Sequence, residues 1–402
     1  ITDHHSPTSD LPEALAIICP KKPGDRYPDQ ILAGVGLAYK LVEAIMLQMQ
    51  VQPLEALEEY LDLVALGTVA DIAPLTGENR SLVRKGLMRL HQQGRQGIIS
   101  LAGVAGINPA KTSAHHIGFM LAPRLNASGR LESALASLRL LTTKDIHEAG
   151  LLAQQLDDLN RERQRITQII SEKADEQARQ NDPEGLILIA YDPEFNAGVV
   201  GLAAMRLCER YYRPAVIAQV GEEITRGSCR SIPEFDIIAA LDQCADLFER
   251  HGGHKAAAGF TICNERLPEL IQRLRAIAVQ QLGGKELRPS LYADLEIPLS
   301  QLRPELLKYM EWLEPTGQDN PRPTFISRGL SVRNAKAVGR DEAHLKLTIS
   351  DGRITYDAIA FRQGNLVKDL PAFVDLLYNF EENEYNSRKN LQLNVIDIRA
   401  SE

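Results

Sequence analysis

The sequence has few cysteines and no long apolar run. Its five cysteines, among 402 residues, are odd in number and form no Cys-x-x-Cys pair, which argues against a disulfide framework or a zinc knuckle and favours a reducing cytoplasm. The best apolar stretch, residues 31–47, is broken by Lys40 and Glu43, so neither a membrane span nor a membrane partner is expected. No signal-peptide pattern, internal repeat or low-complexity segment is found. What remains is a multidomain globular chain.

An excess of basic charge is also lacking. The formal net charge of −8 would ordinarily argue against a nucleic-acid partner, but binding depends on a local basic track rather than on the total. Residues 320–340 contain no acid and five basic side chains, namely Arg322, Arg328, Arg333, Lys336 and Arg340. Two interpretations stay open for this segment: a nucleic-acid-binding patch, or solvated loop charge.

Apolar spacing predicts an α/β chain in four parts. Residues 1–135 combine short apolar runs with helical patterns, which is typical of the C-terminal part of a parallel-sheet domain. Its helices are expected at 31–50, 54–66 and 81–91. Residues 136–182 are predicted to form a connector helix, because helical spacing continues from Thr143, the expected N-cap, to about Gln180. Asn181-Asp182-Pro183 should end this helix.

The third and fourth parts differ in their period. Residues 183–285 predict a second α/β domain, with strands at 185–191, 214–220 and 254–262 and helices at 198–211, 235–250 and 266–282. Residues 290–402 switch to period two, with strands expected at 325–332, 344–349, 354–361, 373–380 and 391–398. Asp351-Gly352 predicts a tight turn between two of them. About five strands in this length indicate a small barrel or sandwich, and an OB-type barrel would suit a nucleic-acid partner.

The motif Asp3-His4-His5 supplies a carboxylate and two imidazoles, which are good ligands for divalent metals. Neighbouring side chains on a strand point to opposite faces. Both histidines can therefore reach one site only where a strand ends and the chain turns, as Ser6-Pro7 permits. An exposed polar loop is the alternative for this motif alone. A second pair, His115-His116, has no flanking acid and is interpreted as structural.

Asp71 is a second acidic candidate. It follows the small and apolar residues 65–70 and precedes Pro74. A carboxylate at the edge of a buried segment needs a partner, because unpaired burial is costly. A helix N-cap and a metal ligand are the two interpretations of Asp71.

Three further motifs could contact phosphate. In "RGSCRS", Ser228 and Arg230 share one face of a strand, and a hydroxyl with a guanidinium suits a terminal phosphate. His254 follows two glycines, which let backbone approach a ligand closely, and is expected at the start of a strand. In "APRLNASGR" a loop is expected to carry Arg124, Asn126 and Arg130. Any one of these motifs alone could be ordinary surface or turn chemistry.

Taken together, the motifs resemble the RecJ family of single-strand-specific exonucleases, within the DHH phosphoesterase superfamily. The resemblance extends over essentially the whole chain. It rests on Asp3-His4-His5 and on the stretches "ALGTVAD", "APRLNASGR", "FNAGVVGLAA", "RGSCRSI", "HGGHKAAAGF", "PTGQDNPRPTF", "HLKLTISD" and "LQLNVIDI". The DHH and glycine-histidine motifs specify only the superfamily. The Pro-Arg-Leu-Asn stretch and the C-terminal strands point to RecJ.

The resemblance implies an activity and a set of roles. His4 and Asp71 would ligate two Mn²⁺ or Mg²⁺ ions, His5 would contact metal or the scissile phosphate, and Asp3 would support this cluster. The roles implied for substrate contact belong to Ser228 and Arg230 at the 5′ phosphate, His254 at a substrate phosphate, and Arg124, Asn126 and Arg130 along the DNA. The implied activity is 5′→3′ hydrolysis of single-stranded DNA in repair and recombination, with a helicase and a single-strand-binding protein as expected partners.

The sequence departs from the family at its start. Superfamily members have an Asp-x-Asp motif and a further Asp before the DHH motif, and this chain has neither. The resemblance therefore implies a piece of a longer protein with an incomplete metal site, expected to be inactive or nearly so alone. Two alternatives are a non-catalytic single-strand DNA-binding relative and a DHH phosphodiesterase acting on short oligonucleotides. The retained ligand candidates argue against the first, and the C-terminal strands argue against the second.

Overall fold

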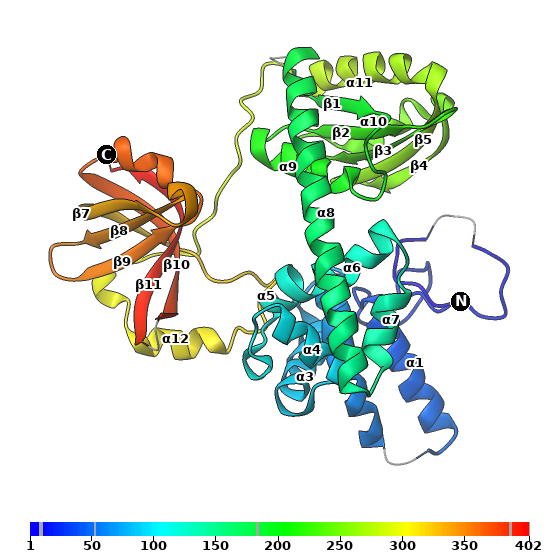
Figure 1. The fold of residues 1–402 in the computed structure, drawn as a ribbon, viewed down its shortest axis with the longest axis horizontal. Coiled ribbons are helices and arrows are strands. Elements are labelled where there is room, and N and C mark those ends of the chain that lie inside the picture. Colours follow the sequence, from blue (N-terminus) through cyan, green and yellow to red (C-terminus); the bar gives the residue numbers. More distant parts are fainter. Residues whose placement is uncertain (8–10, 52–53, 182–184, 386–387, 402) are drawn as a thin grey trace. The chain divides into compact units, whose positions relative to one another are not determined.

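The structure, a computed structural model, describes residues 1–7, 11–51, 54–181, 185–385 and 388–401. The chain divides into two compact units, and each is considered by itself (Figure 1). Unit 1 comprises residues 1–94, 109–119 and 291–402, and unit 2 comprises residues 95–108 and 120–290. Helices and two sheets make the chain α/β, as the sequence predicts. The four-part division of the sequence stays a prediction.

The N-terminal part of unit 1 is mainly helical. Its elements are α1 (Gly34–Gln48), η1 (Leu54–Tyr60), α2 (Leu61–Ala70), α3 (Gly77–Gln93), η2 (Pro109–Lys111), α5 (Ala114–His116) and the π-helical turn η3 (Ile117–Leu121), whose last two residues belong to unit 2. The alternation with strands expected here is reduced, in the described residues, to one parallel bridge between Thr2 and Ile18. The helix expected at 54–66 is present as η1 and α2, and α2 continues as a buried helix to Ala70. Periodicity alone does not distinguish such a helix from a buried strand.

Helices α2 and α3 are in direct backbone contact. A Cβ atom on Gly86 of α3 would lie 2.1 Å from the carbonyl oxygen of Leu61 and 2.6 Å from the Cβ of Ala65. Ala65 is fully buried there. Glycine thus permits a close approach that holds α2 firmly in place, and α2 ends directly before Asp71.

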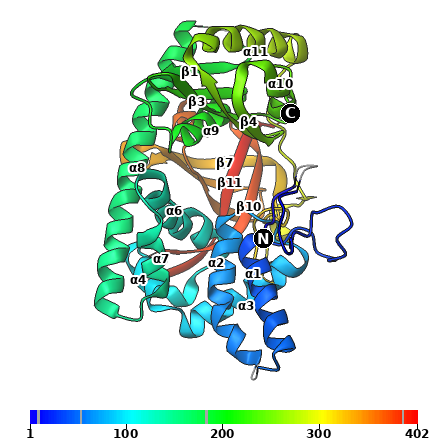
Figure 2. The same cartoon turned by 90° about the vertical axis from the view of Figure 1, so that its right-hand side faces the viewer.

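A long helix organises unit 2. The helices α4 (Gln96–Val104), α6 (Ala122–Leu131) and α7 (Leu135–Thr142) pack along α8 (Ile146–Asn181) (Figure 2). The predicted long helix is confirmed, with its N-cap moved. Asp145 accepts a hydrogen bond from the Glu148 N–H at 2.8 Å, whereas Thr143 ends α7. Both residue types cap helices, so the choice between them falls to packing. Of the predicted stop, Asp182-Pro183 lies outside the described residues.

Unit 2 also contains a five-stranded sheet. Its elements are β1 (Leu188–Asp192), α9 (Val200–Tyr211), β2 (Ala215–Val220), β3 (Ile224–Arg230), α10 (Ile237–Asp242), β4 (Phe248–His254), β5 (Ala257–Cys263) and α11 (Leu267–Leu282). The order is β1-β2-β3-β5-β4, with β1 and β2 parallel and the other pairs antiparallel. Helices α9 and α11 lie on opposite faces of this sheet (Figure 1).

Two predictions for this sheet need correction. The helix expected at 235–250 is only the short α10, because β4 already begins at Phe248. The strand expected at 254–262 begins at Ala257, so His254 ends β4 instead of opening a strand. The reason is a hairpin in which a Cβ atom on Gly253 would lie 2.4 Å from the Ala257 carbonyl oxygen. Only a glycine allows the two strands to meet this closely.

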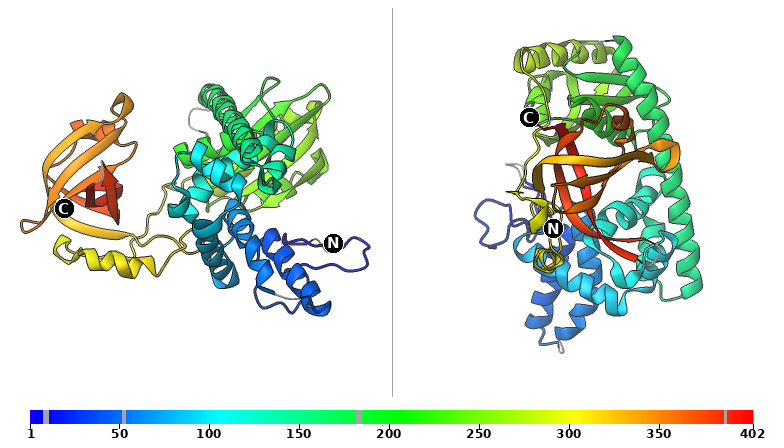
Figure 3. Two further views of the ribbon diagram at one scale, coloured as in Figure 1. Left: turned by 60° about the horizontal axis from the view of Figure 1, so that its bottom comes forward. Right: turned by 90° about the vertical axis from the view of Figure 1, so that its left-hand side faces the viewer.

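The C-terminal part of unit 1 is a barrel (Figure 3). Its elements are β6 (Leu295–Glu296), α12 (Pro304–Glu311), β7 (Phe325–Val338), β8 (His344–Ser350), β9 (Thr355–Ala360), β10 (Phe373–Tyr385) and β11 (Arg388–Ala400). All five strands expected from period two are present. Strand β10 pairs with both β11 and β7 and thereby closes the sheet. The predicted tight turn is confirmed, with Gly352 at φ +87°.

Within the part of the chain that the structure describes, no helix is both long enough and apolar enough to cross a bilayer.

Candidate active site

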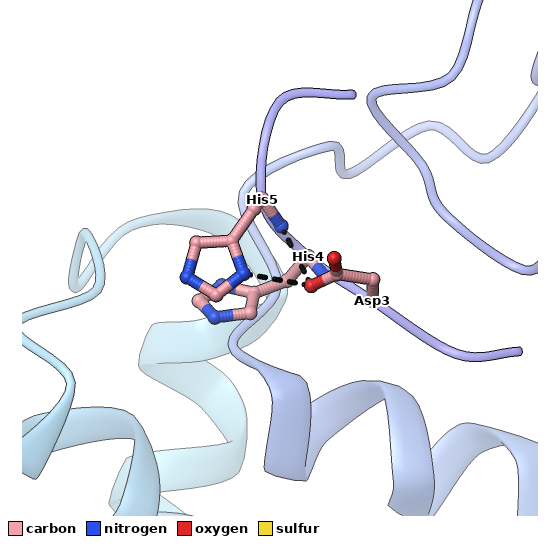
Figure 4. A group of neighbouring side chains, drawn as sticks. All are labelled: Asp3, His4 and His5. Atoms are coloured by element: carbon pink, nitrogen blue, oxygen red, sulfur yellow. Dashed lines mark hydrogen bonds and ion pairs between the residues drawn. The ribbon is translucent and has the colours of Figure 1, made fainter. Parts of the chain in front are cut away.

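The N-terminal bridge ends where the two histidines begin. Asp3 donates its N–H to the Ile18 carbonyl at 3.1 Å, and the chain then bends at His5. The Asp3 Oδ1 atom accepts the N–H of His4 at 2.7 Å and that of His5 at 3.1 Å. It also lies 2.8 Å from the Nδ1 atom of His5 (Figure 4). The turn therefore brings both imidazoles to one side, with their ring centroids 4.3 Å apart.

Asp3 is held in its ionised form. Hydrogen bonds from the backbone N–H and the imidazole of His5 lower the pKa of Asp3 to about 2. A carboxylate bonded to one imidazole nitrogen fixes the ring and leaves its other nitrogen for a ligand. Asp3 thus orients His5, and the Nε2 atom of His5 faces outward on a largely exposed side chain.

Asp71 lies beside this group, at the C-terminal end of α2. The structure places Asp71 at the C-cap, so the N-cap alternative is wrong. Its Oδ2 atom is 3.6 Å from the Nδ1 atom of His4. The C-terminal end of a helix carries partial negative charge, which disfavours a carboxylate there unless a cation is close. The helix thus places Asp71 where a positive charge is needed.

The donor set fits a divalent metal. Ligand atoms of Asp3, His4 and His5 all lie within 4.8 Å of one another, and His4 links them to Asp71. Mixed carboxylate and imidazole ligands suit Mn²⁺ and similar first-row metals, and the carboxylates also suit Mg²⁺. A metal ion would offset the unfavourable position of the Asp71 carboxylate at the C-terminal end of α2. The contact between Asp3 and His5 would orient the imidazole toward such an ion.

The second histidine pair, His115-His116, lies in a different environment. His116 completes a capping box with Ser113, whose hydroxyl accepts the His116 N–H at 3.3 Å. The structural interpretation is thereby supported for His116. His115 is exposed, however, and its ring stacks on Phe119 at a centroid distance of 4.6 Å.

Ser228 and Arg230 lie together on β3 of unit 2. They share a face as predicted, and the Arg230 Nη1 atom donates to the Ser228 hydroxyl at 3.2 Å. The first turn of α9 meets this pair. A Cβ atom on Gly201 would lie 2.9 Å from the Ser228 Oγ atom and 3.2 Å from the Arg230 Nη2 atom. A helix N-terminus, a hydroxyl and a guanidinium therefore converge, which is a suitable environment for an anion.

More positive charge gathers near Arg230. Arg130 donates to the Gly198 carbonyl at 3.2 Å, next to the entrance of α9. Burial lowers the pKa of Arg230, and the charge of Arg130 lowers it further. Burial likewise lowers the pKa of Arg163 on α8, with Arg130 and Arg206 adding to the effect. Among the described residues, Arg130, Arg163 and Arg230 form no ion pair with a carboxylate. The motifs selected from the sequence did not include Arg163, which is partly buried although it belongs to the charged run Arg161-Glu162-Arg163.

Arg124, Asn126 and Arg130 all lie on α6 and not in the expected loop. Pro123 occupies the first turn of a helix, where proline is tolerated, so its presence did not signal a loop. The Arg124 Nε atom donates to Asp157 of α8 at 2.8 Å, and its Nη1 atom donates to the Met120 carbonyl at 2.6 Å. Asp157 is buried. Arg124 thus joins two helices, whereas Asn126 is exposed.

His254 is exposed near the tip of the β4–β5 hairpin. It belongs to unit 2, while Asp3, His4, His5 and Asp71 belong to unit 1. The sequence candidates therefore fall into two sets, one in unit 1 and one in unit 2.

The basic segment 320–340 is partly neutralised. Arg322 lies 3.8 Å from Glu381, and Arg328 lies 3.0 Å from Glu296. Arg340 is 3.7 Å from Asp341. Arg333 and Lys336 are exposed on β7, and Arg333 stands at a β-bulge. Acids from distant segments thus lie beside Arg322 and Arg328, and the adjacent Asp341 lies beside Arg340, which leaves Arg333 and Lys336 as the exposed basic side chains of β7.

Three family models match this chain. The DHH family N-terminal domain matches residues 1–68, the DHHA1 domain matches residues 184–280, and the RecJ OB domain matches residues 293–397. The last match agrees with the closed barrel, and the first contains the Asp3-His4-His5 turn.

Whole-length comparison decides the family. The single-stranded-DNA-specific exonuclease RecJ of Dickeya dadantii is 35% identical over 98% of this chain and 72% of its own length. The chain belongs to the RecJ family. RecJ of Bacillus subtilis is 36% identical over 100% of this chain and 51% of its own length, so the chain spans about half of that relative.

A solved RecJ structure shares the fold. The crystal structure of RecJ from Thermus thermophilus in complex with Mn²⁺ covers 100% of this chain at a TM-score of 0.86 and 32% identity. This chain covers 58% of that RecJ.

Proposed function

We propose that this RecJ-family chain functions in a metal-dependent exonuclease that is specific for single-stranded DNA. One observation carries the proposal. The Nδ1 atom of His4, in the DHH turn, lies 3.6 Å from the Oδ2 atom of Asp71, at the C-terminal end of α2. Relatives over the whole chain are named single-stranded-DNA-specific exonucleases. The reaction proposed is hydrolysis of a phosphodiester bond.

In this proposal His4, His5 and Asp71 hold the metal, and Asp3 orients His5. Mn²⁺ or Mg²⁺, acting as a pair of ions, would polarise the phosphodiester and stabilise the leaving oxygen. Two imidazoles and two carboxylates are few donors for two such ions, which take about six ligands each. We therefore expect the 402 residues alone to bind single-stranded DNA and to release nucleotides slowly or not at all.

The direction of digestion is proposed to be 5′→3′. Ser228, Arg230 and the N-terminus of α9 would hold a 5′ phosphate through charge-assisted hydrogen bonds. Arg130 and His254 would contact further phosphates. Arg124 and Asn126 stay proposed substrate residues, although Arg124 also has its partner Asp157.

The barrel is proposed to hold the trailing strand. OB-type barrels bind single strands through phosphate charges and base stacking. Action in repair and recombination with a helicase and a single-strand-binding protein, and a cytoplasmic location, are parts of the same proposal. The five free cysteines suit a reducing compartment.

The first experiment measures metal binding and digestion together. Binding of Mn²⁺ to the chain is followed by the loss of the free-ion spin-resonance signal, and nucleotide release is measured on 5′-phosphorylated single-stranded DNA. We expect Asp71→Ala to weaken Mn²⁺ binding about ten-fold or more, since a ligand is lost. Asp369→Ala removes another exposed acid of unit 1 and should leave binding unchanged.

The outcomes separate the claims. Equal Mn²⁺ binding by the unsubstituted chain and Asp71→Ala would refute Asp71 as a ligand. Rapid digestion by the 402 residues, abolished by Asp71→Ala, would show that these donors suffice and that the expected weak activity is wrong.

A further inference from the structure

Phe119 is presented to solvent by an unusual turn. Its side chain is 73% exposed and stacks on His115 with the ring planes at 31°. Phe119 lies in the π-helical turn η3. Such turns are rare and frequently occur at functional sites.

The turn itself is firmly held. Ile117 and Leu121, on either side of Phe119, are fully buried. The capping box between Ser113 and His116 fixes the start of the segment. A Cβ atom on Gly118 would lie 3.6 Å from Val69 of α2, so the turn packs against α2 two residues before Asp71. The exposure of Phe119 is therefore built into a packed segment.

Ile72 is a second anomaly at the same helix end. It adopts the left-handed conformation, with φ +56°, and its side chain is 71% exposed. Its N–H bonds to the Val69 carbonyl at 3.1 Å, and the next N–H bonds to Thr68 at 3.2 Å, the pattern of a glycine-type helix end. A β-branched residue is strained there. Strain kept beside a metal-ligand candidate indicates that the side chain is used.

We propose that Ile72 and the His115–Phe119 stack form a platform that contacts nucleobases of the strand whose phosphate reaches Asp71 and His4. This proposal rests on the proposed function. Aromatic and apolar surfaces accept any base, because every base has a π face.

One basic side chain, Arg322, lies near this stack and is shared with the acids Glu314 and Glu381. Arg322 lies close enough to influence His115: burial first, and then this positive charge, lowers the pKa of His115. The stack therefore presents its two rings beside a guanidinium. A nucleobase can stack on the rings, and the guanidinium can contact a phosphate.

The test uses the full chain and single-stranded oligonucleotides carrying one 5-iodouracil at successive positions from the 5′ end. Ultraviolet light should cross-link Phe119 or His115 to the base at one position near that end. Phe119→Ala should weaken binding roughly ten-fold, measured by fluorescence anisotropy. Leu151→Ala removes an exposed apolar side chain of α8, outside the proposed DNA-contacting residues, and should have no effect.

Ile72→Gly separates loss of binding from damage to the fold, because damage would lower the urea midpoint. Glycine accepts the left-handed conformation, so the urea midpoint should rise while oligonucleotide binding weakens several-fold. Ile146→Ala, at an equally exposed isoleucine, should leave binding unchanged.

Each result decides a claim. Normal binding with Phe119→Ala and Ile72→Gly, or cross-links confined to the barrel, would overturn the platform and leave the proposed function intact. A chain that binds no single strand at all would overturn both. Variants that alter the oligomeric state and not DNA binding would make this surface a protein interface and refute the platform.

Discussion

Asp71 and Ile72 are residues that helix chemistry alone would not select. A carboxylate is disfavoured at the C-terminal end of α2, and isoleucine is disfavoured in the left-handed conformation that follows. The two residues are adjacent, and the Nδ1 atom of His4 lies 3.6 Å from the Oδ2 atom of Asp71. At the scale of single residues, departures from local preference thus mark the candidate site.

Arg124 allows a residue-scale prediction. Replacing it by Met leaves Asp157, which is 1% exposed, with the exposed Arg161, 2.7 Å away, as its remaining ion-pair partner among the described residues. Loss of one partner of a buried carboxylate costs up to about 3 kcal/mol, and Arg161 reduces this cost. We expect Arg124→Met and Asp157→Met each to lower the free energy of unfolding measured in urea, and the double variant to lose less than the sum. Unchanged stability with weaker DNA binding would instead make Arg124 mainly a substrate residue.

At the scale of elements, close helix contacts hold the site in place. The backbone of α3 approaches α2 at Gly86 closely enough that a Cβ atom would lie 2.1 Å from the Leu61 carbonyl oxygen. Because α2 ends at the residue before Asp71, this contact also determines where the carboxylate lies.

Gly86→Ala should therefore destabilise the chain. The added methyl group forces α2 and α3 apart, and overpacking of this kind costs about 1–3 kcal/mol. Gly150→Ala on α8 is the matched control, since a Cβ atom there meets nothing within 4 Å. That variant should be neutral or gain up to about 1 kcal/mol from helix propensity. Urea unfolding of both variants gives the comparison, and equal effects would contradict the close contact.

At the scale of the whole molecule, net charge is a poor guide to binding. The chain has a formal charge of −8, yet Arg130, Arg163 and Arg230 gather without paired acids among the described residues. In the barrel, by contrast, the arginines have acidic partners, since Arg322 and Arg328 of the basic segment lie beside acids.

The salt dependence of DNA binding should reflect this distribution. If Arg333 and Lys336 each contact one phosphate of a single strand, their joint replacement by Ala lowers the slope of log K against log salt by about 1.4, or about 0.7 per contact. A Lys144→Ala/Lys285→Ala variant, with two exposed cations of unit 2 removed, should keep the slope. An unchanged slope in the first variant would remove β7 from the DNA path.

The sequence by itself determined the features that depend on short-range spacing. Period two in residues 325–398 predicted the five barrel strands, and helical spacing predicted α8. Alternation along β3 placed Ser228 and Arg230 on one face. The turn at Asp3-His4-His5 could likewise be read from its neighbours. In each case the side chains that matter lie within a few residues of one another, where backbone geometry fixes their direction.

Only the tertiary structure decided the rest. It placed Asp71 beside His4, put Arg124 on a helix paired with Asp157, and moved His254 to the end of β4. It also supplied acids from distant segments to Arg322 and Arg328. These relations join residues far apart in the chain, so they depend on how the elements pack. Local periodicity carries no information on such packing, because the same pattern can be buried against many different partners.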